Sequence, residues 1–369
     1  MTIFHYEGFE TIGTTSSTGA ELEARIPKYP GYTFQEVSGG HTDLIALVDD
    51  FATEGLALRL PLGLSSRGSY LRSEWPAAFK ASTNSGHPVM AAGFRWYNSA
   101  TSPAYARSIW NFMTSATGLG PTLGVASNGV DLTWTDNTGA VTISDVLSVD
   151  EWHFIEIEYK PVPSSSGGYV KLYVDGTEVY HGASRSLVSF TFFSSYGTRL
   201  GLSTTDSEDD GNRPAIDDWY NMSIDGVTHT TPLGDIRVKL LTPTSDATPN
   251  DWAPSAGADN FAMIDEQSWN ETDYVEGDVT GDDDHYGLET LSGTDTVHAL
   301  QIDVVCRATN GTPTLHVGFD DGTADEESGG VIGTSSTKVV RKLFPLDPSG
   351  SAWNETSVND VEATQRMTE

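Results

Sequence analysis

Hydrophobic and polar residues alternate along residues 153–159 with the period of two that a half-buried β-strand shows. One face of this strand carries Ile155, Ile157 and Tyr159, and the other carries Glu156 and Glu158. A second alternating run follows at residues 169–174, and Asp175-Gly176 separates it from a third at residues 177–180. Because Asp-Gly supplies the positive backbone angles of a two-residue turn, these runs predict a β-hairpin.

Short alternating runs recur along the first part of the chain, with turn residues between them and almost no helical periodicity. Strands are predicted at residues 4–9, 56–60, 70–75, 89–97, 123–126, 130–134, 141–143 and 215–224. Ser127-Asn128-Gly129 marks a second hairpin between two of them. Many short strands in a sequence rich in Gly, Thr and Ser predict an all-β fold, a β-sandwich of the jelly-roll type.

A stretch rich in Thr, Pro and Gly at residues 228–234 predicts a linker between two domains. We place the boundary near residue 232, which gives a first domain at residues 1–232 and a smaller second β domain at residues 233–369. The second domain is predicted to contain strands at residues 235–241, 296–308, 314–319 and 337–344, an acidic loop at 320–330 and long ordered loops at 242–284.

The chain is strongly acidic, with 52 Asp and Glu against 20 Lys and Arg and a formal net charge of -32. Binding to phosphate backbones requires clustered Lys and Arg, so the charge argues against nucleic acid and anionic membranes as partners. No run approaches the roughly 20 apolar residues of a membrane span, and the opening MTIFHYEGFE has no secretory signal pattern. We therefore expect a soluble protein without membrane insertion. The single cysteine, Cys306, lies in an apolar run and is predicted to be a buried structural thiol.

Two carboxylates on one strand face are what retaining glycoside hydrolysis needs, and Glu156 and Glu158 are the nearest candidates. They lack the neighbouring Asp and the third acid of a Glu-x-Asp-x-x-Glu pattern. The sequence favours a solvated outer face for both. Because no Gly-x-Ser-x-Gly, His-Glu-x-x-His or phosphate-loop motif occurs either, we assign no catalytic residue and expect no enzymatic activity.

One acidic loop has a spacing similar to that of a calcium loop. Counted from its first acidic residue, carboxylates fall at positions 1, 3, 5 and 12, namely Asp206, Glu208, Asp210 and Asp217, with Gly211 at position 6. Position 12 lacks the bidentate Glu of an EF-hand and Pro214 interrupts the loop, so a solvated acidic turn is the favoured alternative. A second, weaker candidate for Ca2+ is the cluster Asp278, Asp282, Asp283 and Asp284. No cofactor is required.

Exposed aromatic rings stack on sugar rings, and the first domain has several candidates. They are Trp96, Tyr97, Tyr105, Trp110 and Trp134. The alternative is that these rings are buried, which is the more common outcome in a chain with 9 Trp. No glycan-binding residue is assigned from the sequence.

Two stretches resemble the central hairpin of concanavalin A-like, laminin-G-type jelly rolls, namely WHFIEI at residues 152–157 and VKLYVDGTEV at residues 170–179. The opening HYEGFE (5–10) and the strand IDDWY (216–220) are similar to the first and last strands of such domains in structural proteins of tailed phages. In the second domain, GDIR (234–237) and WAPS (252–255) are similar to phage virion proteins of the tail or head surface. Laminin-G-type domains often bind calcium at one rim of the sandwich, which is what the resemblance implies for the loop at 206–217.

The resemblance implies a non-catalytic structural protein of a tailed-virus particle, a component of the tail or a decoration of the capsid, localised in the virion. Its expected partners are other virion proteins, further copies of itself in a homo-oligomer, and a host-surface glycan. The alternative is a carbohydrate-binding module or a glycoside hydrolase of the concanavalin-like fold, because the fold alone does not decide function.

Overall fold

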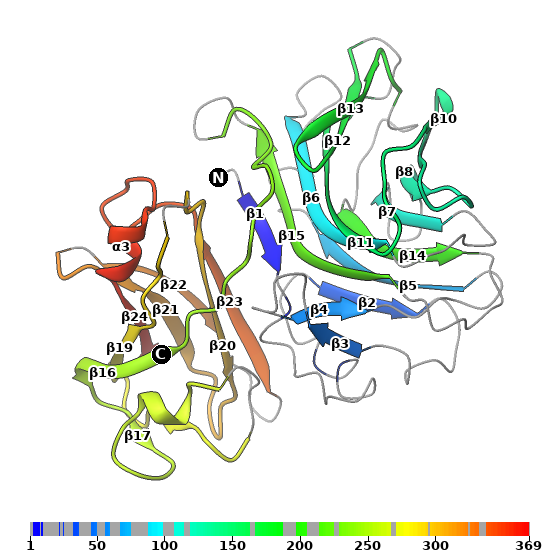
Figure 1. The fold of residues 1–369 in the computed structure, drawn as a ribbon. Helices are drawn as coiled ribbons and strands as arrows, with labels where there is room; N and C mark the ends of the chain where they lie inside the picture. The colour runs from blue at the N-terminus through cyan, green and yellow to red at the C-terminus, as the bar shows by residue number, and fades with distance from the viewer. Residues whose placement is uncertain are drawn as a thin grey trace. The chain divides into compact units, whose positions relative to one another are not determined.

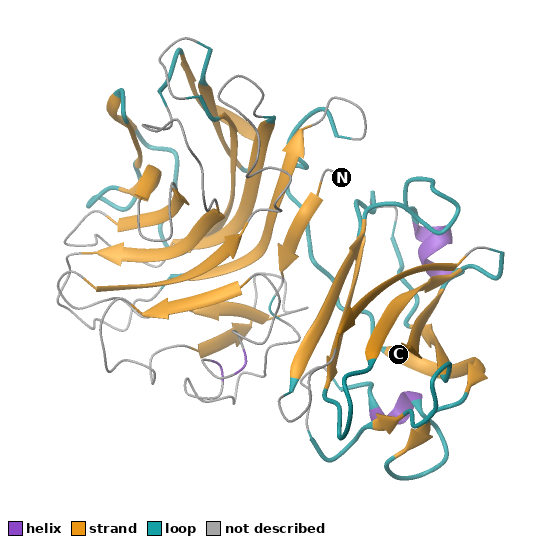
Figure 2. Ribbon diagram, turned by 180° about the vertical axis from the view of Figure 1, so that it is seen from behind, coloured by secondary structure: helices purple, strands orange, loops and turns teal. Residues whose placement is uncertain are grey.

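The structure is a computed structural model that describes residues 3–7, 9, 22, 25, 32–36, 46–49, 56–59, 67–74, 88–98, 107–113, 119–162, 167–186, 197–204, 214–224, 229–266, 271–293, 296–323, 325–331 and 337–368. The chain forms two compact units, with the main division between Val238 and Lys239. In both units, the regular secondary structure that the structure describes is almost all β-strand, with loops between the strands (Figure 2). Among the residues described, no helix has the length and apolar character needed to cross a membrane.

The first unit is a jelly-roll β-sandwich of two antiparallel sheets (Figure 1). The first sheet has the order β13 (Thr177–Ala183), β12 (Tyr169–Val174), β11 (Glu151–Lys160), β6 (Val89–Asn98), β15 (Ala215–Ile224), β4 (Leu56–Arg59) and β3 (Ala46–Asp49), and β1 (Ile3–Glu7) pairs with β15. The second sheet has the order β10 (Gly139–Ile143), β9 (Leu132–Asp136), β8 (Leu119–Val125), β7 (Arg107–Met113), β14 (Gly197–Thr204), β5 (Arg67–Glu74) and β2 (Tyr32–Glu36).

The predicted hairpin of β12 and β13 is confirmed. Asp175 and Gly176 adopt positive φ angles of 50° and 76°, which a two-residue turn between twisted strands requires. Asp175 also accepts the backbone N–H of Phe154 at 2.8 Å and contacts the His153 ring at 2.8 Å, so the turn is fastened to β11. The hairpin therefore stands at a defined position on the edge of the first sheet.

Large aromatic residues fill the space between the two sheets. Trp110 of the second sheet packs edge-on against Tyr159 of the first at 5.6 Å between ring centroids, and it stacks on Trp134 at 6.2 Å. Ile155 and Ile157, which share the face of Tyr159, are fully buried. The odd-numbered positions of β11 thus point into the core, as the alternation predicts.

The second unit is a smaller β-sandwich. Its main sheet has the order β16 (Pro243–Asn250), β19 (Asp283–Leu288), β24 (Glu362–Thr368), β21 (Thr314–Asp320) and β22 (Asp325–Val331). Two-stranded sheets are formed by β20 (Leu300–Cys306) with β23 (Lys338–Phe344) and by β17 (Ala253–Pro254) with β18 (Val275–Glu276), and the short helices are η3 (Phe261–Met263) and α3 (Glu355–Asn359). One core cluster gathers Phe319, Phe344 and Trp353 at ring distances of 5.1 to 5.5 Å, and Cys306 packs at the margin of another.

Three local predictions for the second domain are corrected. The acidic loop predicted at residues 320–330 is mostly strand, because β22 folds back on β21 as a hairpin. Residues 242–284 contain β16, η3 and two short strands in addition to loops. Residues 235–241 form no strand.

Residues 235–241 form no strand because main-chain groups in this region are bonded to side chains and not to a neighbouring strand. Residues 233–238 bond to side chains of the first sheet instead of joining a ladder, and the division between the units consequently falls after Val238, beyond the predicted boundary at residue 232.

Candidate functional site

The candidate site is the outer face of the first sheet, defined here as the side chains of β6, β11, β12 and β15 that point away from the second sheet. Register places these side chains in rows: Glu158 lies opposite Lys171, Glu156 lies opposite both Tyr173 and Gly93, and Phe154 lies opposite Arg95. They occupy the positions between the core residues Ile155, Ile157 and Tyr159.

The predicted solvation of Glu156 and Glu158 is wrong. Only 3% of Glu156 and 7% of Glu158 is exposed to solvent. Alternation shows which residues share a face, but it carries no information on what covers that face. The two carboxylates are buried for different reasons, which divide the outer face into two halves.

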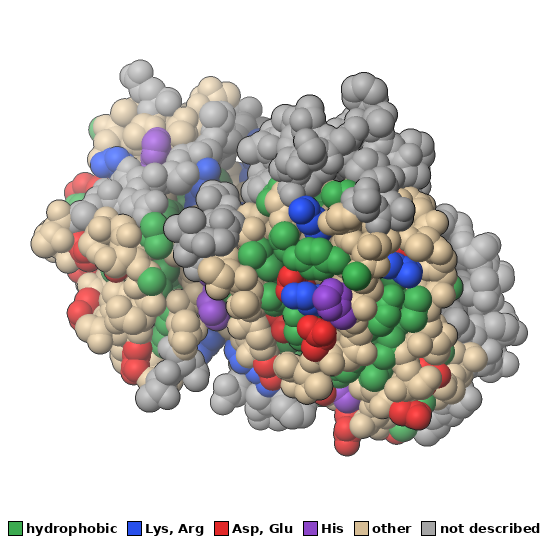
Figure 3. Space-filling view, turned by 90° about the horizontal axis from the view of Figure 1, so that it is seen from above, with side chains coloured by type: hydrophobic (Ala, Val, Ile, Leu, Met, Phe, Trp, Pro, Cys, Tyr) green, Lys and Arg blue, Asp and Glu red, His purple; other side chains and the backbone are tan. Residues whose placement is uncertain are grey.

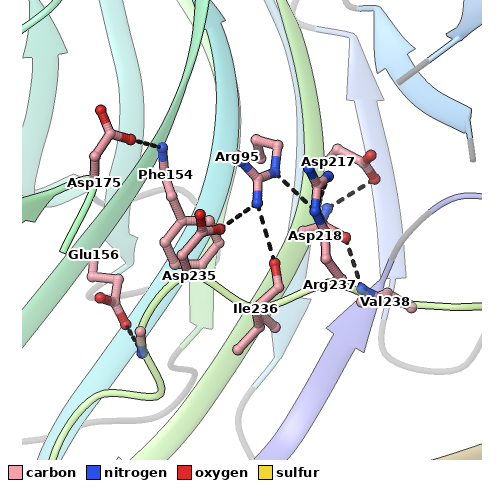
Figure 4. A network of polar contacts seen from close by, with 11 residues as sticks. Arg95, Phe154, Glu156, Asp175, Asp217, Asp218, Asp235, Ile236, Arg237 and Val238 are labelled. Atoms are coloured by element: carbon pink, nitrogen blue, oxygen red, sulfur yellow. Dashed lines mark hydrogen bonds and ion pairs between the residues drawn. The ribbon is translucent and has the colours of Figure 1, made fainter. Parts of the chain in front are cut away.

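The first half is covered by residues 233–238, named here the covering segment (Figure 4). Its backbone N–H at Gly234 donates to Glu156 Oε1 at 2.9 Å, and the N–H of Val238 donates to Asp218 Oδ1 at 2.8 Å. The N–H of Leu233 donates to the Tyr220 hydroxyl at 3.2 Å, and this hydroxyl donates to Glu156. The covering segment is thus held mainly through its main chain.

Arg95 joins the covering segment to the sheet. Its Nε donates to Asp218 Oδ2 at 3.0 Å, and one terminal nitrogen pairs with Asp235 of the covering segment. Its guanidinium lies 5.4 Å from the centroid of the Phe154 ring, and only 5% of the side chain is exposed. Burial raises the pKa of Asp218, while Arg95 and Arg237 act in the opposite direction.

The Phe154 and Tyr220 rings form the floor under the covering segment, stacked at 6.5 Å with an interplanar angle of 17°. Tyr220 lies directly over Gly93, where a Cβ atom would come within 2.2 Å of the ring. Glycine is therefore required at this position for the ring to reach Glu156. Burial also raises the pKa of Glu156, and hydrogen bonds from Tyr220 and Gly234 oppose this shift. We name Arg95, Phe154, Glu156, Asp218 and Tyr220 the covered half.

The open half is defined as Glu158, Tyr169, Lys171, Tyr173 and His181. Glu158 Oε1 accepts the Tyr169 hydroxyl at 2.7 Å, Oε2 accepts the Tyr173 hydroxyl at 3.3 Å, and Lys171 Nζ lies 3.2 Å from both oxygens. Lys171 also lies 5.5 Å from the Tyr169 ring, which meets the His181 ring edge-on at 6.3 Å. One buried carboxylate thus orients three longer side chains.

The side chains of the open half remain accessible. The Lys171 side chain is 27% exposed, Tyr169 and Tyr173 are half-buried, and His181 is exposed. Desolvation and the Glu158 charge both raise the pKa values of the Tyr169 and Tyr173 hydroxyls, so both stay protonated donors. The space-filling view in Figure 3 shows a face on which histidine, basic and acidic side chains gather among hydrophobic ones.

Three of the candidate sugar-stacking residues are core residues. Trp96, Trp110 and Trp134 are at most 1% exposed, and Tyr105 lies outside the described residues. Tyr97 is half-buried and packs against Trp152 at 5.5 Å, at the far end of the outer face beyond Arg95 and Phe154. The aromatic residues on the outer face therefore differ from those that the sequence singled out, with Tyr97 as the exception.

The first predicted calcium loop lies mostly outside the described residues. Asp206, Glu208 and Asp210 belong to the part that is not described, so this prediction stays a prediction. Asp217 is fully buried on β15, and its Oδ1 accepts the N–H of Asp218 at 2.8 Å.

The second acidic cluster is divided between two structural roles. Asp282 accepts the backbone N–H groups of Asp278 and Val279 and so closes a turn. Asp284 is fully buried and bonds to the Trp252 N–H, the Asn260 amide and the Tyr286 hydroxyl at 2.7 to 2.8 Å. Within the part of the chain that the structure describes, no group of three His, Cys, Asp or Glu side chains is arranged to hold a metal ion.

Cys306 packs against the core of the second unit as a half-buried thiol. Burial raises its pKa to about 11, so the thiol is protonated at neutral pH and is a poor nucleophile.

The open half could have been found in the sequence. Tyr169, Lys171 and Tyr173 alternate with Val170, Leu172 and Val174, which places the first three on one face of the first strand of the predicted hairpin. The covered half had no such signal, because Arg95 and Glu156 meet residues of the covering segment that are far away in the chain.

The fold and the outer face together define a jelly-roll β-sandwich with an aromatic and charged surface on one sheet. No protein-family model and no curated protein matches the chain. Among solved structures, it is similar to an endo-β-1,4-glucuronan lyase from the fungus Trichoderma reesei, with 15% identity, a TM-score of 0.36 and coverage of 60% of this chain and 96% of that one. Domain 4 of an extracellular arabinanase from Geobacillus stearothermophilus, in complex with arabinotriose, gives 14% identity, a TM-score of 0.37 and coverage of 60% and 92%.

A carbohydrate-binding module from Bacillus subtilis gives 12% identity, a TM-score of 0.30 and coverage of 52% of this chain and 96% of that one. Likenesses at this level carry no information on the activity of this chain, and function has to be argued from the outer face itself.

Proposed function

We propose that this protein is a non-catalytic glycan-binding protein and that the open half of the outer face is its binding surface. The observation that carries the proposal is the cluster of Tyr169, Lys171 and Tyr173, held in place by Glu158. Tyrosine offers a ring for apolar sugar faces and a hydroxyl for sugar hydroxyls. Because Glu158 already orients these side chains, little side-chain entropy remains to be lost on binding.

The state of the carboxylates supports binding without catalysis. Glu158 accepts hydrogen bonds from the three side chains of Tyr169, Lys171 and Tyr173, so this carboxylate is not presented to a substrate whether or not the covering segment is in place. A retaining hydrolase needs one carboxylate as nucleophile and the other as general acid. The raised pKa values of Tyr169 and Tyr173 also make these tyrosines poor general bases.

The binding proposal is tested with a panel of polysaccharides in pull-down and calorimetry, comprising cellulose, xylan, arabinan, alginate and polygalacturonate. We expect binding to at least one of them, and a loss of about tenfold or more in affinity on Tyr173→Ala, equivalent to about 1.4 kcal/mol. Tyr274→Ala is the matched control, because Tyr274 is an exposed tyrosine of the second unit. No binding at all, or equal effects of the two substitutions, would overturn the proposal.

The non-catalytic part has its own test. We expect no release of reducing ends or unsaturated products from the same polysaccharides. Cleavage that Glu156→Gln or Glu158→Gln abolishes would identify an enzyme instead. The tailed-virus role predicted from the sequence stays a prediction, and detection of the chain in purified particles would test it.

A further inference from the structure

The outer face continues beneath the covering segment with the same chemistry as the open half. The sheet presents the stacked Phe154 and Tyr220 rings, two carboxylates and Arg95 at that place. Beyond the covering segment, the half-buried Tyr97 and Trp152 pair lies on the same face. Among the residues that the structure describes, outward-facing aromatic side chains therefore run from Trp152 past the Glu158 row to Tyr169, and the covering segment lies over the middle of this strip.

The length of this strip suits a ligand of several sugar units. Trp152 and Glu158 are outward-facing residues of the same strand, and a strand rises about 3.3 Å per residue, so they lie roughly 20 Å apart along β11. The open half alone spans only one end of this distance.

The contacts of the covering segment are those that a polyol would make. Glu156 and Asp218 accept main-chain N–H groups, and Arg95 donates towards the carbonyl oxygen of Ile236 at 3.4 Å. Sugar hydroxyls both donate and accept hydrogen bonds, so they can replace each of these partners.

The charges of the covered half select the class of glycan. Release of the covering segment removes the Asp235 carboxylate and the Arg237 guanidinium together, which leaves Arg95 paired with Asp218, and Glu156 bonded to the neutral Tyr220 hydroxyl. In the open half, Lys171 is balanced by Glu158. The face then has more acidic than basic groups, on a chain whose net charge is -32, so an anionic glycan is disfavoured.

We infer that the glycan-binding face extends beneath residues 233–238, and that this segment is an internal competitor for an uncharged glycan long enough to span both halves. The inference rests on the proposed function. A glycan confined to the open half leaves the segment in place, whereas a longer one displaces it.

Hydrogen–deuterium exchange on the full-length chain tests the inference directly, with neutral cello-, xylo- and arabino-oligosaccharides from disaccharides to hexasaccharides as probes. A bound hexasaccharide is expected to accelerate exchange in residues 233–238 by about tenfold or more, because the amides of Gly234 and Val238 lose their carboxylate acceptors. Disaccharides are expected to leave this exchange unchanged. A hexasaccharide that binds and leaves the segment equally or more protected would overturn the inference.

Variants of the covering segment give a second readout. Gly234 has a φ of 85°, which proline cannot adopt, so Gly234→Pro removes both its conformation and its N–H donor. We expect Gly234→Pro and Asp235→Asn to tighten hexasaccharide binding by about tenfold. Both substitutions weaken the contacts of the covering segment, so the binding-competent state, which is rarely populated in the wild type, becomes more populated. Glu151→Gln removes an exposed carboxylate outside the segment and is the charge-matched control, expected to have no effect.

The failures of the two proposals are distinguishable. Glycan binding that Tyr173→Ala weakens, without displacement of residues 233–238, retains the proposed function and rejects the inference. Tighter binding of uronate hexasaccharides than of neutral ones rejects the uncharged class. If no oligosaccharide binds, both proposals are rejected.

Discussion

Glu156 and Glu158 lie two positions apart on β11 and point from the same face, yet they belong to halves of the outer face that are built differently. Glu156 is buried by a segment from elsewhere in the chain, which it binds through a main-chain N–H. Glu158 is buried by side chains of the adjacent strand β12, which it orients towards solvent. In the covered half, the buried carboxylate therefore holds the covering segment in place. In the open half, the buried carboxylate holds exposed side chains in a fixed arrangement.

The difference extends to the basic residues. The Arg95 side chain is 5% exposed and holds two carboxylates, one of them in the covering segment. The Lys171 side chain is 27% exposed and meets one carboxylate. We therefore expect substitutions in the covered half to affect stability and those in the open half to affect binding.

Arg95→Met is expected to have the largest effect, because it leaves the buried Asp218 without its Arg95 partner. Removal of one partner of a buried ion pair costs about 3 to 5 kcal/mol. Urea unfolding followed by tryptophan fluorescence measures this loss in free energy of unfolding. The matched substitution Lys171→Met is expected to cost about 1 kcal/mol or less. Equal losses would remove the distinction between the halves.

Gly93→Ala is expected to have the second largest effect, a loss of about 1 to 3 kcal/mol in the free energy of unfolding, since the added Cβ overlaps the Tyr220 ring. The displaced ring also loses its contact with Glu156. In a Tyr220→Ala background the same substitution is expected to cost little. A full cost in that background would show that the Tyr220 ring is not the obstacle.

Glu156→Gln tests how the stability of the covered half depends on pH. Burial raises the pKa of Glu156 in the folded state, so the folded protein binds this proton more tightly than the unfolded chain does. The contribution of Glu156 to the wild-type free energy of unfolding is therefore fully present below the ordinary carboxyl pKa. It falls as the pH rises towards the raised pKa of the folded state. Relative to the wild type, the Gln variant is expected to gain stability between acidic and neutral pH. A difference in unfolding free energy that does not vary with pH would contradict this.

Tyr173→Phe is expected to have the smallest effect on stability, about 1 kcal/mol or less, because Tyr173 is only half-buried and water can replace its long hydrogen bond to Glu158. The same substitution is expected to weaken glycan binding measurably in calorimetry. Reduced stability without reduced binding would assign the tyrosine to the fold and not to the surface.

Parts of the site could be predicted because they depend on local order along the chain. The alternation of Tyr169, Lys171 and Tyr173 with aliphatic residues placed them on one face, and Asp175-Gly176 determined the turn that presents them. Trp96, Trp110 and Trp134 are buried, as the alternative favoured from the sequence predicts, but aromatic character alone does not separate a core face from an outer face.

The sequence by itself determined the two-residue period of the strands, the hairpin and the sharing of one face by Glu156 and Glu158. Only the tertiary structure decided that this face is covered on one half and accessible on the other. The physical reason is that the covering contacts are long-range: Glu156 and Gly234 are 78 residues apart, and Arg95 and Asp235 are 140 residues apart. A period along a strand records which side chains point together, whereas burial depends on which distant segment comes to lie on them.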